Sequence, residues 1–212
     1  MTMGDEALCQ MERHLCLAQG EADFREIHAS EKNLVLWRRS ADPTVSSLLD
    51  DIDLPSDFSL RRELSPIGAT ERLEMEFDAM DISPSHGRRK WAADIARLLS
   101  LFCHVAGTRR AVLRLEVVAD DACRLFHTDN VSMRMVCTYR GLGTEWLPNA
   151  FVNRQNLCQG DNDLVCRDWN AVQHLKPFWV ALMKGKRAAG LIHRSPPFAG
   201  EPRVFLCLDP VE

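Results

Sequence analysis

The stretch Cys123–Tyr139, CRLFHTDNVSMRMVCTY, places a histidine and a carboxylate just before a strand-like segment. His127 and Asp129 are separated by one residue, and apolar residues alternate with polar ones over Val131–Tyr139. Such alternation predicts a strand with one buried face. If the chain is already extended at His127, its side chain and that of Asp129 point the same way. One imidazole and one carboxylate are then placed to share a metal ion.

A third ligand is available near the C-terminal end of the sequence. His193 lies in GLIHRSPP, residues 190–197, whose apolar start predicts another short strand. Two histidines and one carboxylate with open coordination positions form the facial triad of non-haem Fe(II) oxygenases. The alternative is three unrelated polar residues in a β-rich domain, because a single His-x-Asp pair is common by chance.

The composition is that of an ordinary globular protein. The chain has 212 residues, of which 46% are hydrophobic and 26% charged, and its net charge is -4. A chain of this kind can bury a core without disulfides. No basic block dominates, so nucleic-acid binding has no electrostatic support, and a small-molecule substrate or a protein partner is expected. The oligomeric state stays open.

The sequence also bears on location. No apolar run reaches the roughly 18 residues of a membrane span. The first residues lack the pattern of a signal peptide. We therefore expect a cytoplasmic protein without a membrane partner.

None of the eight cysteines forms a CxxC pair, so the spacing of a structural zinc site is missing. In a reducing compartment we expect mostly free thiols. The cysteines are Cys9, Cys16, Cys103, Cys123, Cys137, Cys158, Cys166 and Cys207.

The N-terminal part is expected to carry little regular structure. Residues 1–25 are mixed and polar, which predicts a loosely attached leader before a single domain at 26–212. The segment 32–39, KNLVLWRR, is typical of a short strand. Asp42 and Pro43 have the pattern of a helix start, with Asp as the N-cap and Pro at the first helical position.

The helix that follows is predicted over residues 44–52. Residues 53–70 contain several Pro and Gly residues and are predicted to be irregular. Leu73, Met75 and Phe77 alternate with acidic residues, which predicts a half-buried strand.

The clearest helical pattern covers residues 88–105. Its apolar stripe consists of Trp91, Ile95, Leu98 and Phe102. Gly107 is placed to end the helix. We expect this helix to pack against the sheet formed by the strands that follow it.

Those strands are predicted at 111–118, 131–139, 144–147, 178–183, 190–193 and 204–208. No helix alternates with them, which disfavours a parallel α/β sheet. Several short strands behind one helix predict an α+β fold that is mainly β. We expect an antiparallel barrel or jelly roll supported by N-terminal helices.

An arginine follows the third candidate ligand at a useful distance. Arg203 comes ten residues after His193, at the start of the last predicted strand. The segment between them, PPFAGEP at 196–202, is predicted to form the loop of a hairpin that brings the guanidinium close to the metal. A planar, permanently charged guanidinium suits a carboxylate-bearing cosubstrate, because it can bind both oxygens at once.

The order His127-x-Asp129, His193 and Arg203 resembles that of the Fe(II)/2-oxoglutarate dioxygenase superfamily. In that superfamily, a His-x-Asp/Glu pair and a distal His hold iron, and a later Arg or Lys binds the distal carboxylate of the cosubstrate. Its fold is a double-stranded β-helix, a cupin-like jelly-roll barrel. The resemblance implies Fe(II) and 2-oxoglutarate as cofactors and a hydroxylation-type oxidation of an unidentified substrate.

A more specific resemblance rests on three segments that match in order. They are FHTDNVSMRMVCTYRGLGTEWLP at 126–148, VNR at 152–154, and GLIHRSPP at 190–197 followed by RVFLCLD. They resemble a bacterial family known as domain of unknown function 1826, over roughly residues 30–209. That family implies no activity, so the step to an oxygenase depends on superfamily analogy.

Two faces of the 131–139 strand offer cosubstrate ligands. Tyr139, the only tyrosine of the chain, could hydrogen-bond 2-oxoglutarate, or it could be buried with its hydroxyl satisfied. Arg134 and Thr138 share the opposite face. If that face lines the barrel, they become the candidates and Tyr139 no longer qualifies.

Substrate contacts are expected from the loop after 141–144, because loops on a rigid scaffold often bind ligands. Trp146, Asn153 and Arg154 lie near the expected mouth of the barrel. Trp146 could instead belong to the core. Arg154 could recognise an acidic substrate or be solvated.

Three functions remain open at this stage. The first is the iron- and 2-oxoglutarate-dependent oxygenase, which Arg203 distinguishes from the others. The second is a non-catalytic protein with zinc in the same site, which affinity order alone does not exclude. The third is a metal-free jelly-roll protein that binds a partner.

Overall fold

The structure is a computed structural model that describes residues 13–120, 123–185 and 190–211. Its strands form two sheets. The larger, in the order β1-β2-β8-β5-β10-β4-β3, contains β1 (Leu15–Ala18), β2 (Leu34–Trp37), β3 (Ser59–Leu64), β4 (Ala111–Val118), β5 (Met133–Arg140), β8 (Val180–Lys184) and β10 (Arg203–Pro210). The smaller, β7-β6-β9, contains β6 (Glu145–Leu147), β7 (Gln173–His174) and β9 (Ile192–Arg194).

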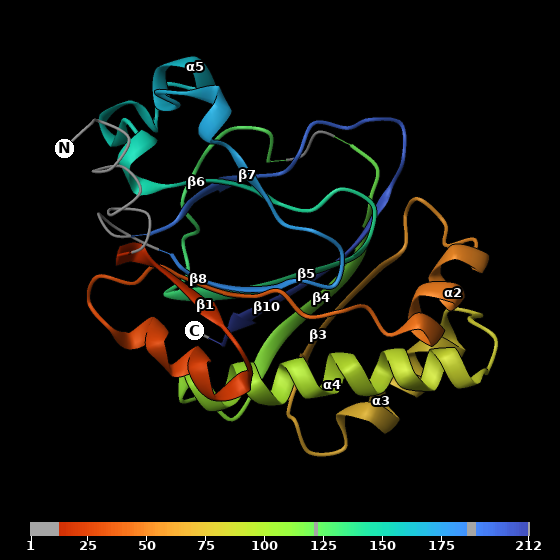
Figure 1. The fold of residues 1–212 in the computed structure, drawn as a ribbon. Helices are drawn as coiled ribbons and strands as arrows, with labels where there is room; N and C mark the ends of the chain where they lie inside the picture. The colour runs from red at the N-terminus through yellow and green to blue at the C-terminus, as the bar shows by residue number, and fades with distance from the viewer. Residues whose placement is uncertain (1–12, 121–122, 186–189, 212) are drawn as a thin grey trace.

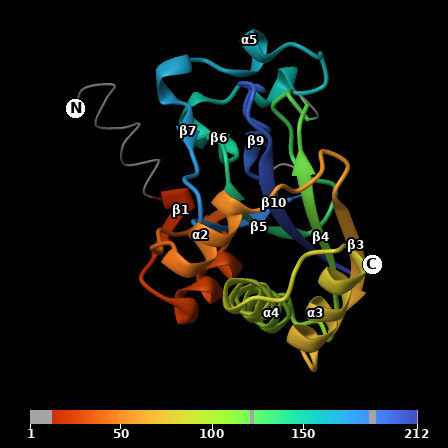
Figure 2. The ribbon, with the colours of Figure 1, turned by 90° about the vertical axis from the view of Figure 1, so that its right-hand side faces the viewer.

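The α-helices are α2 (Pro43–Asp51), α3 (Ala69–Ala79), α4 (His86–Ala106) and α5 (Asn162–Val165). The 3-10 helices are η1 (Glu21–His28), η2 (Asn149–Phe151), η3 (Arg154–Asn156) and η4 (Trp169–Ala171). Figures 1 and 2 show three layers: α4 with α2 and α3, then the larger sheet, then the smaller sheet. The fold is therefore a mixed α/β arrangement around a large sheet.

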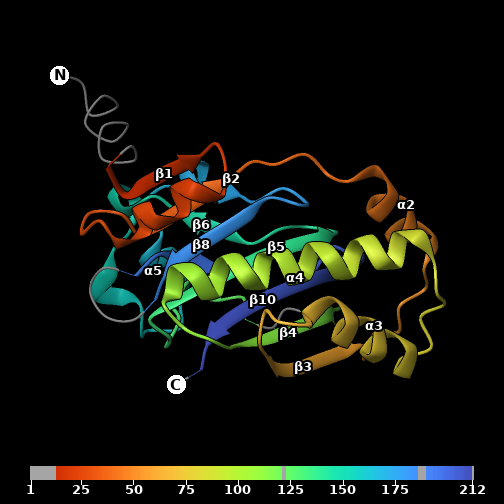
Figure 3. The ribbon, with the colours of Figure 1, turned by 90° about the horizontal axis from the view of Figure 1, so that it is seen from below.

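The main core lies between α4 and one face of the larger sheet, as Figure 3 shows from below. Successive residues of a strand point to opposite faces, so β4 buries Leu113 and Leu115 in this core and turns Arg114 and Glu116 the other way. Strands β5 and β10 alternate in the same manner. Their second face looks toward the smaller sheet and lines a cavity.

Helix α4 confirms the predicted helix and extends it slightly. Ser85 caps its first turn by accepting a hydrogen bond from the main-chain N–H of Arg88. Gly107 ends it in the left-handed conformation, with φ 65°, which glycine adopts without strain. The predicted start at Asp42 is also confirmed, because its carboxylate accepts from the N–H groups of Thr44 and Val45.

Two predictions for the N-terminal half were wrong. Residues 69–79 form helix α3 instead of a strand, and strand β3 lies inside the stretch predicted to be irregular. In α3, Leu73 and Phe77 are fully buried while Met75 is 60% exposed. An i, i+4 pair on one face is the helical pattern, and an alternating sequence in such a short segment fits both periods.

The prediction of a loosely attached leader at residues 1–25 also needs correction for residues 13–25, which the structure describes. Residues 1–12 lie outside the described residues. Residues 15–18 form β1, which pairs in parallel with β2 at the edge of the larger sheet. Phe24 in η1 is completely buried. Residues 13–25 are thus part of the folded unit, because their apolar side chains complete its core.

The predicted hairpin before Arg203 was wrong as well. Strand β9 pairs with β6, whereas β10 pairs with β4 and β5. Residues 196–202 therefore cross from the smaller sheet to the larger one. Within the described ranges, the two sheets are separate and no ladder closes them into a barrel. No helix there is long and apolar enough to cross a membrane.

Candidate metal centre and adjoining cavity

The two candidate histidine ligands are brought together by the main chain. His127 and His193 form an isolated antiparallel bridge in which the N–H of each donates to the carbonyl of the other, at 3.0 and 3.1 Å. Side chains directly opposite in such a pair lie on the same side. The ring centroids are 4.7 Å apart, and ligand atoms of His127, Asp129 and His193 all lie within 4.8 Å of one another.

Hydrogen bonds fix which nitrogen of each imidazole faces the third ligand. Nδ1 of His127 lies 2.8 Å from the carbonyl of Leu125, and Nδ1 of His193 lies 3.2 Å from that of Leu191. A carbonyl only accepts, so each Nδ1 carries a proton, and in the neutral form of each imidazole Nε2 presents a lone pair. Metal-ligating histidines have this arrangement, with the other ring nitrogen donating to a carbonyl or carboxylate.

Asp129 contributes an oxygen that lacks a donor. Its side chain is 5% exposed, and Oδ2 lies 3.3 Å from Nε2 of His193. With that nitrogen unprotonated, no described group donates to Oδ2. Two nitrogen lone pairs and one carboxylate oxygen therefore converge without a proton between them. A buried acceptor set of this kind is stabilised by a cation, and its N,N,O chemistry suits a divalent transition metal.

The charge states agree with ligand function. Burial is the main cause that lowers the pKa of His127, and it favours the neutral imidazole. Burial alone would raise the pKa of Asp129, but that pKa is lowered overall, and the charge of Arg134 contributes to the lowering. The carboxylate is therefore ionised.

Arg134 holds the other oxygen of Asp129. Its Nη1 donates to Oδ1 of Asp129, while Nε and Nη2 donate to the two oxygens of Asp209 at 2.6 and 2.8 Å. The guanidinium is thus shared between two carboxylates and is fully engaged. Arg134, a candidate for binding the cosubstrate, is held in this structure between the carboxylates of Asp129 and Asp209.

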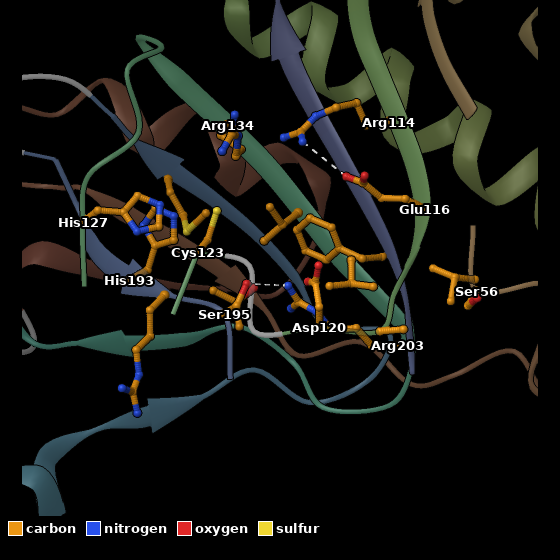
Figure 4. Close-up of a pocket in the computed structure, with 18 residues that line it drawn as sticks. Ser56, Arg114, Glu116, Asp120, Cys123, His127, Arg134, His193, Ser195 and Arg203 are labelled. Carbon is orange, nitrogen blue, oxygen red and sulfur yellow. Dashed lines mark hydrogen bonds and ion pairs between the residues drawn. The ribbon is translucent and has the colours of Figure 1, made fainter. Parts of the chain in front are cut away.

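A cavity of about 440 Å³ adjoins the triad, between the inner face of the larger sheet and β9 (Figure 4). Its size is typical of small-molecule sites. His127 and His193 lie on one side of it, and Arg203 and Ser195 lie on another. The side chains of Val136, Met183 and Phe205 supply apolar wall.

Arg203 is a buried cation in the wall of this cavity. It is 7% exposed, its Nη2 donates to Ser195 Oγ at 2.8 Å, and its guanidinium lies 4.6 Å from the centre of the Phe205 ring. Its Nη1 is buried without a hydrogen-bond partner in the described chain. Burial lowers the pKa of Arg203 to about 10, although Glu116 and Asp120 partly oppose the shift. An anion in the cavity would accept from the orphaned N–H and balance the charge.

Tyr139 lies on the opposite face of the sheet from the cavity, so it does not bind a ligand there. Its hydroxyl donates to Asp94 at 2.7 Å, and its ring packs edge-on against Trp91 and Phe178. The buried-tyrosine alternative was the correct one. Arg134 is on the inner face of the sheet, as expected if the face opposite Tyr139 lines the cavity. Thr138 shares this face, but it is not among the residues that line the cavity.

The three substrate candidates from the sequence do not line the cavity either. Trp146 is 3% exposed and packs in a second apolar cluster between the sheets. Arg154 donates to Asn149 Oδ1 and to the carbonyl of Gly190, which ties two loops together. Asn153 donates its main-chain N–H to Val165. Their contacts are structural.

A family model described as "Protein of unknown function (DUF1826)" matches residues 18–209. The chain belongs to the DUF1826 family. The match confirms the more specific of the two resemblances seen in the sequence. No curated protein matches this DUF1826 chain.

Several solved structures resemble the DUF1826 chain in overall arrangement. A dioxygenase for auxin oxidation from rice is 14% identical, with 94% of this chain and 80% of that chain covered and a TM-score of 0.49. Dioxygenase for auxin oxidation 1 from Arabidopsis thaliana, in a complex with 2-oxoglutarate, is 11% identical, with coverages of 92% and 91% and a TM-score of 0.46. HygX from Streptomyces hygroscopicus, with iron bound, is 10% identical, with coverages of 81% and 88% and a TM-score of 0.37. At these values the likeness assigns neither a function nor a residue.

Three residues of the DUF1826 site were missed in the sequence. Ser195 lies two residues after His193, and Asp209 lies six residues after Arg203 on β10, so the two-residue period of a strand would have placed both on the inner face. Gly141 lies so close to Arg203 that an added Cβ would approach its Cα to 3.0 Å, and its φ is 83°. A glycine is needed there because β10 passes this turn at close range.

Proposed function

We propose that this DUF1826 protein is an Fe(II)- and 2-oxoglutarate-dependent oxygenase that hydroxylates a small molecule. One observation carries the proposal: an unpaired acceptor set and an unpaired donor lie at the same cavity, which His127, His193 and Arg203 line. The Nε2 lone pairs of His127 and His193 converge with Oδ2 of Asp129 without a donor, and Nη1 of Arg203 lacks an acceptor among the described residues. A protein that only stores a metal has no use for the second group.

The triad would hold the iron from one side, which leaves the side toward the cavity for other ligands. When bound, iron supplies the chemistry by which 2-oxoglutarate and O₂ become succinate and CO₂ while one oxygen atom enters a substrate C–H bond as hydroxyl. Arg203 and Ser195 would bind the distal carboxylate of 2-oxoglutarate. Because Arg134 already occupies Oδ1 of Asp129, that carboxylate would bind metal through Oδ2 alone.

The apolar wall has a role of its own. Val136, Met183 and Phe205 limit the water that can enter beside the metal, and water exclusion strengthens the electrostatic contacts of the site. The two facing sheets are consistent with a double-stranded β-helix whose halves are joined by side chains instead of a continuous ladder.

The test is an anaerobic titration of the metal-free protein with Fe(II) and then with 2-oxoglutarate, followed by visible absorbance. A weak new charge-transfer band is expected on addition of 2-oxoglutarate. In Arg203→Ala the metal should still bind, but 2-oxoglutarate should bind more weakly by about 2–5 kcal/mol. Tyr139→Phe, on the other face of the sheet, is the matched control and should keep the band.

Two results would contradict the proposal. If metal binds and no band forms, the alternative of a non-catalytic zinc protein takes its place. If Arg203→Ala binds 2-oxoglutarate as tightly as the parent protein, Arg203 has no part in cosubstrate binding.

A further inference from the structure

A second pair of charged side chains faces the cavity from the wall opposite the triad. Arg114 and Glu116 lie two residues apart on β4, so both point to its inner face. Their Nη1 and Oε1 are 3.2 Å apart, and their side chains are 26% and 27% exposed. Figure 4 shows this pair across the cavity from His127 and His193.

The hydrogen bonds between the strands of the sheet do not depend on the ion pair of Arg114 and Glu116. Arg114 also donates to Cys207 Sγ at 3.1 Å and lies 3.8 Å from Asp209. Within the described ranges, the carboxylate of Glu116 hydrogen-bonds Arg114 alone. A partly exposed ion pair of this kind contributes little to stability. Ligand pockets, in contrast, are mostly apolar with a few polar groups that fix orientation.

The pair lies beside the place expected for the cosubstrate and does not overlap it. In the β4–β10 ladder, Val118 is opposite Arg203, Glu116 is opposite Phe205, and Arg114 is opposite Cys207. At the usual rise of a strand, the pair is therefore about 7 and 13 Å along the wall from Arg203. Phe205, whose ring contacts Arg203, lies opposite Glu116 in this ladder. A second small molecule can occupy this part of the cavity.

We infer that the molecule bound by Arg114 and Glu116, and oxidised at this site, is a free α-amino acid. Its carboxylate would accept from Arg114 and its ammonium group would donate to Glu116, so one internal ion pair is replaced by two charge-assisted pairs. This inference rests on the proposed function for the oxidation, while the binding itself depends only on the pair.

Charge explains why a zwitterion is preferred. A ligand with only a carboxylate would place a negative charge beside Glu116. A ligand with only an amine would place a positive charge beside Arg114. Like charges and desolvated unpaired charges reject the wrong ligand. The two charged groups of an amino acid, its carboxylate and its ammonium, cancel. Arg114 and Glu116 therefore each keep a partner of opposite charge.

The test is calorimetry on the full-length protein loaded with Mn(II), with and without 2-oxoglutarate, using each common amino acid singly. Every amino acid that binds is compared with its N-acetyl and carboxamide derivatives. We expect at least one to bind, and we expect either derivative to bind about tenfold more weakly or worse, which corresponds to the loss of one charge-assisted contact.

Two variants assign the two contacts. In Glu116→Gln, N-acetylation should no longer weaken binding, because the partner of the ammonium group is gone. In Arg114→Gln, the carboxamide should bind as well as the free acid. Arg110→Gln is the matched control: Arg110 pairs with Glu63 on the surface, at 60% and 43% exposure, and its loss should change nothing.

The outcomes separate this inference from the proposed function. If no amino acid binds, or if a bound one is unaffected in both Arg114→Gln and Glu116→Gln, the inference is wrong even though 2-oxoglutarate binds. If amino acids bind with the expected pattern but 2-oxoglutarate does not, the zwitterion site stands and the oxygenase proposal is wrong.

Discussion

At the scale of single residues, the imidazole of His127 has the orientation that the proposed metal site requires. Its Nδ1 donates to Leu125, and its ring is one-third exposed at the edge of the cavity. We therefore expect His127→Ala to abolish tight divalent-metal binding without unfolding the protein. Elemental analysis of the metal-to-protein ratio checks this. His174→Ala is the control, because His174 is 62% exposed and outside the triad; an unchanged ratio in His127→Ala would remove the residue from the site.

In the proposed site, Arg134 would act on the metal through Asp129, without contacting it. It fixes one oxygen of Asp129 and is itself held by Asp209, and partners of metal ligands typically change metal affinity by ten- to a hundredfold when removed. We expect a loss of that size in Arg134→Met and in Asp209→Asn, measured by competition with a chelator under conditions where each variant is folded.

A matched variant separates this role from a structural one. Arg39 forms a comparable ion pair with Asp94 on the helix side of the same sheet. Arg39→Met should lower the free energy of unfolding by about 3–5 kcal/mol, because it leaves a carboxylate unpaired, yet it should leave metal affinity unchanged. Equal metal affinities in Arg134→Met and Arg39→Met would show that Arg134 only supports the fold.

At the scale of elements, local sequence signals predicted helix α4 but not helix α3. Helix α4 spans 21 residues, and its stripe, cap and terminal glycine all agree. Helix α3 spans 11 residues and begins at a glycine without a side-chain cap. Over so few residues, an apolar alternation fits a strand as well as it fits a helix, and only packing against α4 decides.

This difference can be tested with two substitutions in α3. Leu73 is fully buried and Met75 is 60% exposed. Leu73→Ala should therefore lower the free energy of unfolding by about 2–5 kcal/mol, whereas Met75→Ala should change it by less than about 0.5 kcal/mol. Urea denaturation measures both values. A strand would place the two side chains on one face, so similar losses would contradict the helix.

At the scale of the whole molecule, the triad could be proposed from sequence because its residues have distinctive chemistry. Their juxtaposition could not be derived, since it depends on a bridge between His127 and His193 that lies outside any ladder of several residues. The face of β5 that lines the cavity was likewise undecided. Helix α4 covers the face of β5 that carries Tyr139, and this leaves Arg134 on the face toward the cavity. Which face is buried is a property of layer packing, and a two-residue period alone does not fix it.

The whole molecule also responds to alkaline pH through its buried thiols. Cys137 and Cys207 have no exposed surface, and burial raises the pKa of each from 9.0 to about 12. Between these values, the unfolded chain loses both protons while the folded protein keeps them. The unfolded state then binds fewer protons, so stability is full below about pH 9 and decreases as pH rises toward 12, by at most about 1.4 kcal/mol per pH unit for each thiol.

Urea denaturation at a series of pH values above neutrality measures this slope. The double variant Cys137→Ala, Cys207→Ala will be less stable at neutral pH because it leaves cavities, but its stability should decline less steeply in alkali. Cys123→Ala and Cys158→Ala are the controls, since both thiols are exposed. An identical slope in the parent and the double variant would mean that the two thiols ionise in the folded state, and that the layer between α4 and the cavity admits water.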